Sequence, residues 1–372
     1  MQKTSIAIIG GGLAGLTAAI HLSKLGYDVT VFEKNTFPRH KVCGEYISNE
    51  VLPYLQSLDI DVASLEPTNI TDLHFSTTNG TSIKIKLPLG GFGISRFVLD
   101  EYLYKKALKN GTIVLIDNVT NVQFDNNHFS INTTENGNFT AKIVIGAFGK
   151  RSTLDTAFNR KFILKKSNWL AVKAHYSGDF DNTLVGLHNF FGGYCGVSKV
   201  ENNLINICYI TNYDAFKSHK NIVDFENKIV TQNPFLKNIF DNSTISFEKP
   251  LTISQISFAQ KPAIENHIIM IGDTAGLIHP LCGNGMAMAI KSAKIAAEII
   301  DDYLTHKITS RTQVEQHYQN QWNKNFRNRL FFGRTISKIL QKPKLATLLI
   351  RIFIKIPSAV SLIIKNTHGK PF

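Results

Sequence analysis

Apolar and polar residues recur along the chain with two different periods, and these periods separate two kinds of predicted element. Residues 5–9 form a short apolar run of the buried-strand type. Residues 16–25 then place apolar side chains at helical spacing, and Gly26 follows as a helix-ending glycine. A second strand over 28–32 completes a strand–helix–strand unit, which predicts an α/β fold.

Two distant segments extend this unit. Residues 94–111 predict an amphipathic helix that is entered through Ser95 and Arg96. Residues 268–271 predict another buried strand, and the turn after it leads into a helix rich in small residues. We therefore expect a discontinuous domain, and list its segments here: 1–72, 93–155 and 250–305.

Strand-like alternation marks a second unit, first over 73–87 and again from Trp169 to Tyr209. Three turn signals suggest hairpins: Asn79-Gly80, Asp181-Asn182 and Glu201-Asn202-Asn203. We predict an antiparallel sheet, interleaved in sequence with the first domain and built from residues 73–92 and 156–249.

The C-terminal region, residues 306–372, predicts helices and is strongly basic. No Asp or Glu follows Glu315, whereas eleven Lys or Arg lie between Lys324 and Lys370. From about Asn323 we expect two or three helices. The apolar stretch 345–364 contains two charges and a proline, which argues against a membrane span. Two readings stay open: a helix lying on an anionic membrane surface, or a cap packed over a cavity of the protein itself.

The amino-acid composition narrows the classes of function that the chain could have. The formal net charge is +13, but the basic block forms no recognisable nucleic-acid-binding module or aromatic platform, so nucleic-acid binding is not favoured. The four cysteines are widely spaced without a CxxC pair, which argues against a metal site or a disulfide framework. The N-terminus leads almost directly into a strand and leaves no room for a signal peptide, so we expect a cytoplasmic protein.

The glycine-rich turn after the first strand carries the first chemical signal. Residues 10–15 read GGGLAG and fit the GxGxxG pattern, with a strand before, a helix after and Glu33 at the end of the next strand. Gly10 allows the tight turn, Gly12 lets backbone approach a pyrophosphate, and Gly15 lets helix and strand pack closely. Glu33 is placed to accept hydrogen bonds from ribose hydroxyls. This predicts a dinucleotide site, without separating FAD from NAD.

The stretch 268–293, IIMIGDTAGLIHPLCGNGMAMAIKSA, favours a flavin. Asp273, at the end of a strand, is placed to hydrogen-bond a ribityl hydroxyl. The turn over 283–286 would offer helix N-terminal N–H groups to negative charge on a flavin ring. Arg96, at the start of its own helix, is placed to meet a phosphate or the flavin.

These motifs, in this order, resemble the FAD-dependent oxidoreductases of the aromatic-hydroxylase superfamily. The stretch PRHKVCGEYIS at 38–48 resembles more specifically the P-R-x-K-x-C-G-E-x-x-S loop of geranylgeranyl reductase and FixC-like flavoproteins. The resemblance covers roughly residues 4–305. It implies that Arg39 and Lys41 face the diphosphate, and that Cys43, Gly44 and Glu45 approach the isoalloxazine or the substrate.

From the motifs and the resemblance together we assign the site. The catalytic candidates are Cys43 and Glu45, and no metal ligand is expected. The FAD-binding candidates are Gly10, Gly12, Leu13, Ala14, Gly15, Glu33, Lys34, Arg39, Lys41, Cys43, Gly44, Arg96, Val119, Gly149, Gly272, Asp273, Pro280, Gly283, Asn284, Gly285 and Met286. The resemblance also places residues 190–195, FFGGYC, on the substrate cavity.

One position departs from the superfamily pattern. Residues 143–152, IVIGAFGKRS, carry Phe148 where an aspartate usually stands. The resemblance links that acid to the use of FAD and NAD(P)H, so a hydroxylase-type reaction with NAD(P)H is in doubt. Lys150 and Arg151 would still attract a phosphate. NAD(P)H thus stays open as an electron donor, but no second fingerprint supports a permanently bound nicotinamide.

Three functions follow from this reading. The first is an FAD-dependent reductase or dehydrogenase acting on carbon–carbon bonds of an isoprenoid or another apolar or aromatic molecule, with a ferredoxin-type protein as one candidate donor. The second is an oxygen- and NAD(P)H-dependent monooxygenase of an aromatic or polyketide-like substrate. The third is an FAD-binding partner without turnover in a biosynthetic complex. The loop at 38–48 and the basic tail favour the first.

Overall fold

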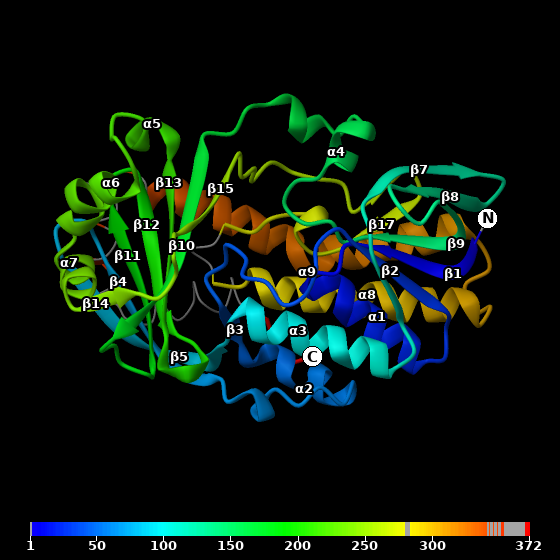
Figure 1. Ribbon diagram of the computed structural model, residues 1–372, viewed down its shortest axis with the longest axis horizontal. Coiled ribbons are helices and arrows are strands. Elements are labelled where there is room, and N and C mark those ends of the chain that lie inside the picture. Colours follow the sequence, from blue (N-terminus) through cyan, green and yellow to red (C-terminus); the bar gives the residue numbers. More distant parts are fainter. Residues whose placement is uncertain are drawn as a thin grey trace.

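A computed structural model of the chain shows two sheets facing one another, with helices around them (Figure 1). It describes residues 2–279 and 283–340, with the backbone alone for 336–340. Beyond these it describes residues 342, 345, 348, 351, 352 and 369–372.

The first sheet contains the predicted nucleotide-binding unit. The order of its strands is β16, β17, β9, β1, β2, β6, and all neighbours in this row are parallel except β16 and β17. Strands β7 and β8 join β9 as an antiparallel meander. The strands are β1 (Gln2–Ile9), β2 (Val29–Glu33), β6 (Ile113–Ile116), β7 (Val119–Asp125), β8 (His128–Thr133), β9 (Asn138–Gly146), β16 (Ile264–Glu265) and β17 (Ile268–Met270).

Three helices cover one face of this sheet, below it in Figure 1: α1 (Leu13–Lys24), α3 (Arg96–Lys109) and α8 (Gly285–Leu304). They share an apolar core in which Leu16, Leu103 and Ile290 are buried. Helix α3 begins where predicted, because Ser95 Oγ accepts a hydrogen bond from the backbone N–H of Val98 at 3.1 Å. The short helix α2 (Leu52–Ser57) lies below these helices in Figure 1, whereas α4 (Thr153–Ala157) lies above the sheet and contacts β7.

The second sheet is antiparallel except for one parallel pair, β4 with β11. Its order is β14, β10, β13, β12, β11, β4, β5, β3, with β15 also paired to β10. The strands are β3 (Tyr46–Ser48), β4 (Thr68–Ser76), β5 (Ser82–Gly93), β10 (Trp169–Gly178), β11 (Leu184–Phe190), β12 (Gly193–Lys199), β13 (Ile205–Asn212), β14 (Ser243–Ile245) and β15 (Leu251–Ser254). Strands β3 and β15 fall in segments that the sequence analysis grouped with the nucleotide-binding domain.

One face of the second sheet is closed by short helices. These are α5 (Tyr213–Phe216), α6 (Ile222–Lys228) and α7 (Pro234–Asp241), at the far left in Figure 1. Phe225 and Leu236 from these helices are buried against Tyr209 and Cys195 of the sheet. The opposite face of the sheet is therefore the one that faces the nucleotide-binding domain.

Two of the three hairpin predictions are confirmed and one is wrong. Asn79-Gly80 joins β4 to its neighbour β5, and 201–203 join β12 to β13. Asp181-Asn182 joins β10 to β11, but β13 and β12 lie between those strands. A turn signal shows where the chain reverses and not which strand it pairs with, because long-range pairing decides that.

The C-terminal helix α9 runs without a break from Arg311 to Leu340, so Asn323 lies inside a helix and does not begin a new one. Tyr318, Trp322 and Phe326 of α9 are buried in the core of the first domain. Most of the apolar stretch 345–364 lies outside the described residues. Within the part of the chain that the structure describes, no helix is long and apolar enough to cross a membrane.

Candidate active site

A cavity of about 700 Å³ lies between the carboxyl ends of the first sheet and the open face of the second. Such a strand-end crevice is where open α/β sheets bind their ligands. One end is polar and contains the glycine-rich turn, and the other is apolar and is formed by the second sheet. Nineteen of the predicted cofactor residues line it: Gly10, Gly12, Leu13, Ala14, Glu33, Lys34, Arg39, Lys41, Cys43, Gly44, Arg96, Val119, Gly149, Gly272, Asp273, Gly283, Asn284, Gly285 and Met286.

Two predicted residues are not among them. Pro280 lies outside the described residues. Gly15 does not line the cavity, and a Cβ at this position would lie 2.0 Å from the Gly10 carbonyl oxygen. Gly15 therefore allows α1 to pack against the turn, which is the structural part of the fingerprint.

The glycine-rich turn leaves open space where an anion would lie. Gly10 has φ +112°, and a Cβ on it would be 2.3 Å from the Ala147 carbonyl oxygen, so only glycine fits. A Cβ on Gly12 would meet only two cations, Arg96 Nη2 at 3.8 Å and Lys41 Nζ at 3.9 Å. Gly12 also caps the N-terminus of α1, where unpaired N–H groups and the helix dipole attract negative charge.

A buried carboxylate holds both cations in place. Asp100, whose side chain has no solvent exposure, accepts bonds from Arg96 Nε at 2.7 Å, Arg96 Nη2 at 2.8 Å and Lys41 Nζ at 2.7 Å. Burial would raise the pKa of Asp100, but the charges of Arg96 and Lys41 outweigh it and hold that pKa below its usual range. The cluster carries one net positive charge beside Gly12, which fits a diphosphate.

Glu33 occupies the end of β2 as predicted and is already partly bound by the protein. Its Oε2 accepts the N–H of Gly11 at 2.9 Å, and its Oε1 accepts Arg39 Nη2 at 2.9 Å. The carboxylate thus ties the glycine-rich turn to Arg39 of the loop 38–48. Lys34 and Val119 line the same end of the cavity.

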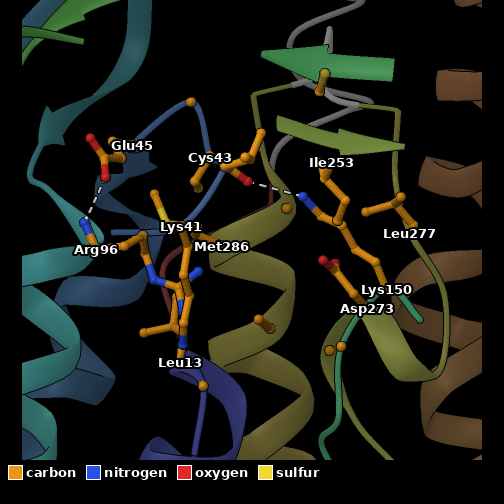
Figure 2. Close-up of a pocket in the computed structure, with 18 of the residues that line it drawn as sticks. Leu13, Lys41, Cys43, Glu45, Arg96, Lys150, Ile253, Asp273, Leu277 and Met286 are labelled. Carbon is orange, nitrogen blue, oxygen red and sulfur yellow. Dashed lines mark hydrogen bonds between the residues drawn. The ribbon is translucent and has the colours of Figure 1, made fainter. Parts of the chain in front are cut away.

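Glu45 is the centre of a second buried charge cluster. Its Oε1 lies 2.6 Å from Lys173 Nζ and accepts the N–H of Arg96 at 2.8 Å (Figure 2), and its Oε2 lies 2.7 Å from His175 Nε2. Burial would raise the pKa of Glu45, but the His175 hydrogen bond and the Lys173 charge keep it below its usual range. Glu45 is therefore a fixed carboxylate at neutral pH and a poor proton donor.

His40 connects this charge cluster to the cavity. Its ring stacks on Phe97 at 4.6 Å and meets the ring of His175 edge-on at 5.1 Å. Burial, followed by the nearby charge of Lys173, lowers the pKa of His40 to about 4. The imidazole is accordingly neutral at physiological pH.

The loop 38–48 is fixed to three separate elements. Lys41 is bound to Asp100 of α3, the Val42 carbonyl accepts Lys150 Nζ at 3.1 Å (Figure 2), and the Cys43 carbonyl accepts Asn206 Nδ2 at 3.3 Å. The Cys43 thiol also interacts with the Arg96 guanidinium. The loop therefore forms one wall of the cavity, between its polar and its apolar end.

The opposite wall comes from the turns after β9 and β17. Lys261, itself buried, donates to the Lys150 carbonyl at 3.0 Å and to the Asp273 carbonyl at 2.9 Å, which ties the two turns together. Gly149 N–H donates to Thr274 Oγ1 at 2.7 Å. The N-terminus of α8 opens on the same wall, with Gly283 at φ +60° before it.

The apolar end is made of aliphatic and aromatic side chains of the second sheet. They come from the inward positions of five strands, which are Leu73, Phe75, Ile83, Ile85, Leu87, Val185, Leu187, Tyr194 and Ile253. The prediction that 190–195 line the cavity holds only for Tyr194. Phe190 and Cys195 are buried on the other face, against the helices, and Phe191 is exposed. Strand alternation explains this, because neighbouring residues point to opposite faces.

Several residues of the site escaped the sequence analysis. Asp100 follows Arg96 by four positions on a helix, which is the spacing of an ion pair. Lys173 stands alone in the apolar strand WLAVKAHY, and a lysine there signals a buried charge that needs a partner. The alternation in SIKIKL indicates that Ile83, Ile85 and Leu87 share one face.

Comparisons with known proteins agree with this geometry. Residues 5–42 match the family model described as FAD dependent oxidoreductase. A digeranylgeranylglycerophospholipid reductase of Methanococcus vannielii is 22% identical over 355 residues, which cover 92% of this chain and 87% of that protein.

Solved structures share the fold over nearly the whole chain. The flavin-dependent brominase Bmp2 aligns with a TM-score of 0.81 at 18% identity, covering 97% of this chain and 92% of that one. A geranylgeranyl bacteriochlorophyll reductase-like protein from Thermoplasma acidophilum aligns with a TM-score of 0.76 at 19% identity, covering 98% and 97%. The second sheet, with its helices on the outer face, is thus part of a fold that flavoproteins use.

Proposed function

We propose that this FAD-dependent oxidoreductase reduces carbon–carbon double bonds of an isoprenoid or another lipid-like molecule. The observation that carries the proposal is the apolar end of the cavity, where the inward side chains of β4, β5, β11 and β15 are aliphatic or aromatic. An apolar chain would bury its surface there without leaving polar groups unpaired. The relative that reduces a digeranylgeranyl lipid supports the same substrate class.

The cofactor fits the polar end. The space beside Gly12 between two cations suits the diphosphate, and Glu33 at the end of β2 suits the adenosine ribose. The turn of Asp273 and the N-terminus of α8 suit the ribityl chain and the flavin ring. Reduced FAD held by these residues would supply the hydride for the substrate.

The chain itself has to provide a proton at the second alkene carbon. Cys43 is our candidate for this role, because it lines the cavity at the boundary between the polar and the apolar end. Glu45 lines the cavity as well, but its carboxylate is engaged by Lys173, His175 and the Arg96 N–H, so we assign it a positioning role. Its bond to Arg96 helps to fix the start of α3.

A monooxygenase is the alternative that a specific observation favours. A probable FAD-dependent monooxygenase from Pseudomonas aeruginosa shares the fold, and Lys150 and Arg151 line the cavity as candidate contacts for a nicotinamide phosphate. Phe148 argues against this alternative, because an apolar ring stands at the position where the superfamily pattern has an acid.

A substitution in the apolar wall tests the substrate class. Leu187→Asp places a charge against the proposed hydrocarbon chain, and we expect FAD binding to persist while kcat/KM for a polyprenyl lipid falls about tenfold or more. Ile245→Asp is the matched control, since Ile245 lies on β14 of the same sheet, is 40% exposed and does not line the cavity. Equal activity of the two variants on the lipid would contradict the proposal.

A further inference from the structure

The C-terminal helix presents two adjacent aromatic side chains to solvent. Phe331 is 61% exposed and Phe332 is 36% exposed, whereas Trp322 and Phe326 of the same helix are buried. Lys324 and Arg327 precede them on the helix and are exposed as well. Large exposed aromatics next to basic residues mark interaction surfaces more often than free protein surface.

A second exposed apolar row follows in the chain. Leu345, Leu348 and Ile352 are helical in the structure and are 44%, 55% and 42% exposed. Their spacing of three and four residues places them on one side of a helix. Lys342 and Arg351, also exposed, flank this row. Apolar and basic groups thus recur together over both segments.

We propose that this basic apolar surface, made by Arg327, Phe331, Phe332, Leu345, Leu348 and Ile352, docks on an anionic lipid bilayer. The sequence after Glu315 contains no acid and eleven Lys or Arg, so its charge is complementary to anionic head groups. The apolar side chains would enter the region between head groups and acyl chains while the basic ones stay at the surface. A second copy of this chain is disfavoured as occupant, because two surfaces of equal positive charge would meet.

The docking surface is close to the cavity wall. Leu330, which precedes Phe331, packs against the 272–279 segment, with its Cδ1 3.2 Å from where a Cβ on Gly276 would lie. The next residue, Leu277, lines the cavity. A bilayer held at Phe331 and Phe332 would therefore lie near the wall of a cavity that we expect to receive a lipid. The docking itself does not depend on the reaction and is tested without turnover.

Vesicle sedimentation of the FAD-loaded full chain tests the proposal. We expect binding to phosphatidylcholine vesicles that contain about one-third phosphatidylglycerol, little binding to phosphatidylcholine alone, and release at high salt. The double variant Phe331→Ser, Phe332→Ser should bind the anionic vesicles about tenfold more weakly. Phe191→Ser is the matched control, because Phe191 is a 58% exposed aromatic on the turn between β11 and β12.

Flavin content and thermal unfolding of each variant verify that it is folded. Three results would overturn the proposal: no binding of the wild type to anionic vesicles, equal binding of the double variant, or an equal loss in the Phe191 variant. Binding to phosphatidylcholine alone with the same strength would also overturn it, since the charge would then have no part. Lipid reduction is assayed in detergent, without vesicles, so none of these results affects it. The docking proposal can therefore fail while the proposed reductase activity holds, and the reverse is also possible.

Discussion

Glu45 and Lys173 form an ion pair of 2.6 Å in which neither side chain is exposed to solvent. Glu45 belongs to the loop before β3 and Lys173 to β10, so the pair joins the loop that walls the cavity to the middle of the second sheet. His175, two residues further along β10, binds the other carboxylate oxygen at 2.7 Å. These contacts anchor the loop 38–48, which lies between the polar and the apolar end of the cavity, to strand β10.

Removing the charge of only one partner of this ion pair should lower the free energy of unfolding. Glu45→Gln leaves the Lys173 ammonium buried without a counter-charge, and we expect a loss of roughly 3–5 kcal/mol in the free energy of unfolding. The double variant Glu45→Gln, Lys173→Met removes both charges and should recover a large part of that loss. Urea denaturation of the two single variants and the double variant measures the coupling. Additive losses in the double variant would show that the two charges are not coupled.

Gly12 and Gly15 belong to the same motif, but substitutions at the two positions should have different effects. A Cβ on Gly12 meets only the tips of Arg96 and Lys41 at 3.8 and 3.9 Å, whereas a Cβ on Gly15 lies 2.0 Å from backbone oxygen. Gly12→Val should therefore fold and fail to retain FAD, because the side chain fills the proposed diphosphate space. Gly15→Val should fail to fold. Circular dichroism and flavin absorbance distinguish these outcomes, and normal flavin content in a folded Gly12→Val protein would remove the basis of the site.

Arg96 should contribute strongly to FAD affinity. Its guanidinium is held by Asp100 at 2.7 and 2.8 Å and faces the open space beside Gly12. We expect Arg96→Met to raise the Kd for FAD about tenfold to a hundredfold, which is the range for losing a hydrogen bond to a charged group. Arg151→Met is the matched control, because Arg151 lines the cavity but is exposed and bonded to Gln255. Fluorescence titration of the apoprotein gives both values, and equal affinities would refute the assignment of Arg96.

Glu226, which does not line the cavity, should make the stability of the protein depend on pH. Burial raises its pKa to about 7, with a smaller opposing effect from the Tyr209 hydrogen bond of 3.1 Å. The folded protein then keeps this proton up to about pH 7, whereas the unfolded chain loses it near 4.5. The free energy of unfolding should therefore fall as the pH rises through this window.

The variant Glu226→Gln removes that titration. At pH 8 it should be more stable than the wild type by about 1–3 kcal/mol, and its stability should vary less between pH 5 and pH 7. Thermal or urea unfolding across this range measures the difference. Parallel stability curves for the two proteins would show that Glu226 does not titrate in this window.

The sequence predicts the cofactor half of this protein well because its signals are local. The turn of Gly10 and Gly12, the acid at Glu33 and the cap at Ser95 each depend on a few neighbouring residues, and each lies where predicted. The partners of Glu45 could not be predicted in the same way. Lys173 and His175 reach it from more than a hundred residues away, through a pairing of strands that no local pattern encodes.

Local sequence patterns are equally insufficient to predict which residues form the apolar end of the cavity. Alternation in SIKIKL indicates which residues share a face, but not which face meets the cavity and which the helices α6 and α7. That choice depends on the packing of Phe225 and Leu236, and it is why Phe190 and Cys195 face away from the site while Tyr194 lines it. The resemblance placed all of 190–195 on the cavity, but Phe190 is buried outside it and Phe191 is exposed.

Reoxidation of the reduced enzyme under argon tests the central claim most directly. The flavin is reduced with dithionite, excess reductant is removed, and a geranylgeranyl lipid is added while the flavin band and the product mass are followed. The account predicts that the yellow band returns without oxygen and that the lipid gains two hydrogen atoms per flavin reoxidised. A flavin that stays reduced until air is admitted would contradict reduction of the lipid, and an oxygenated lipid formed then would establish the monooxygenase.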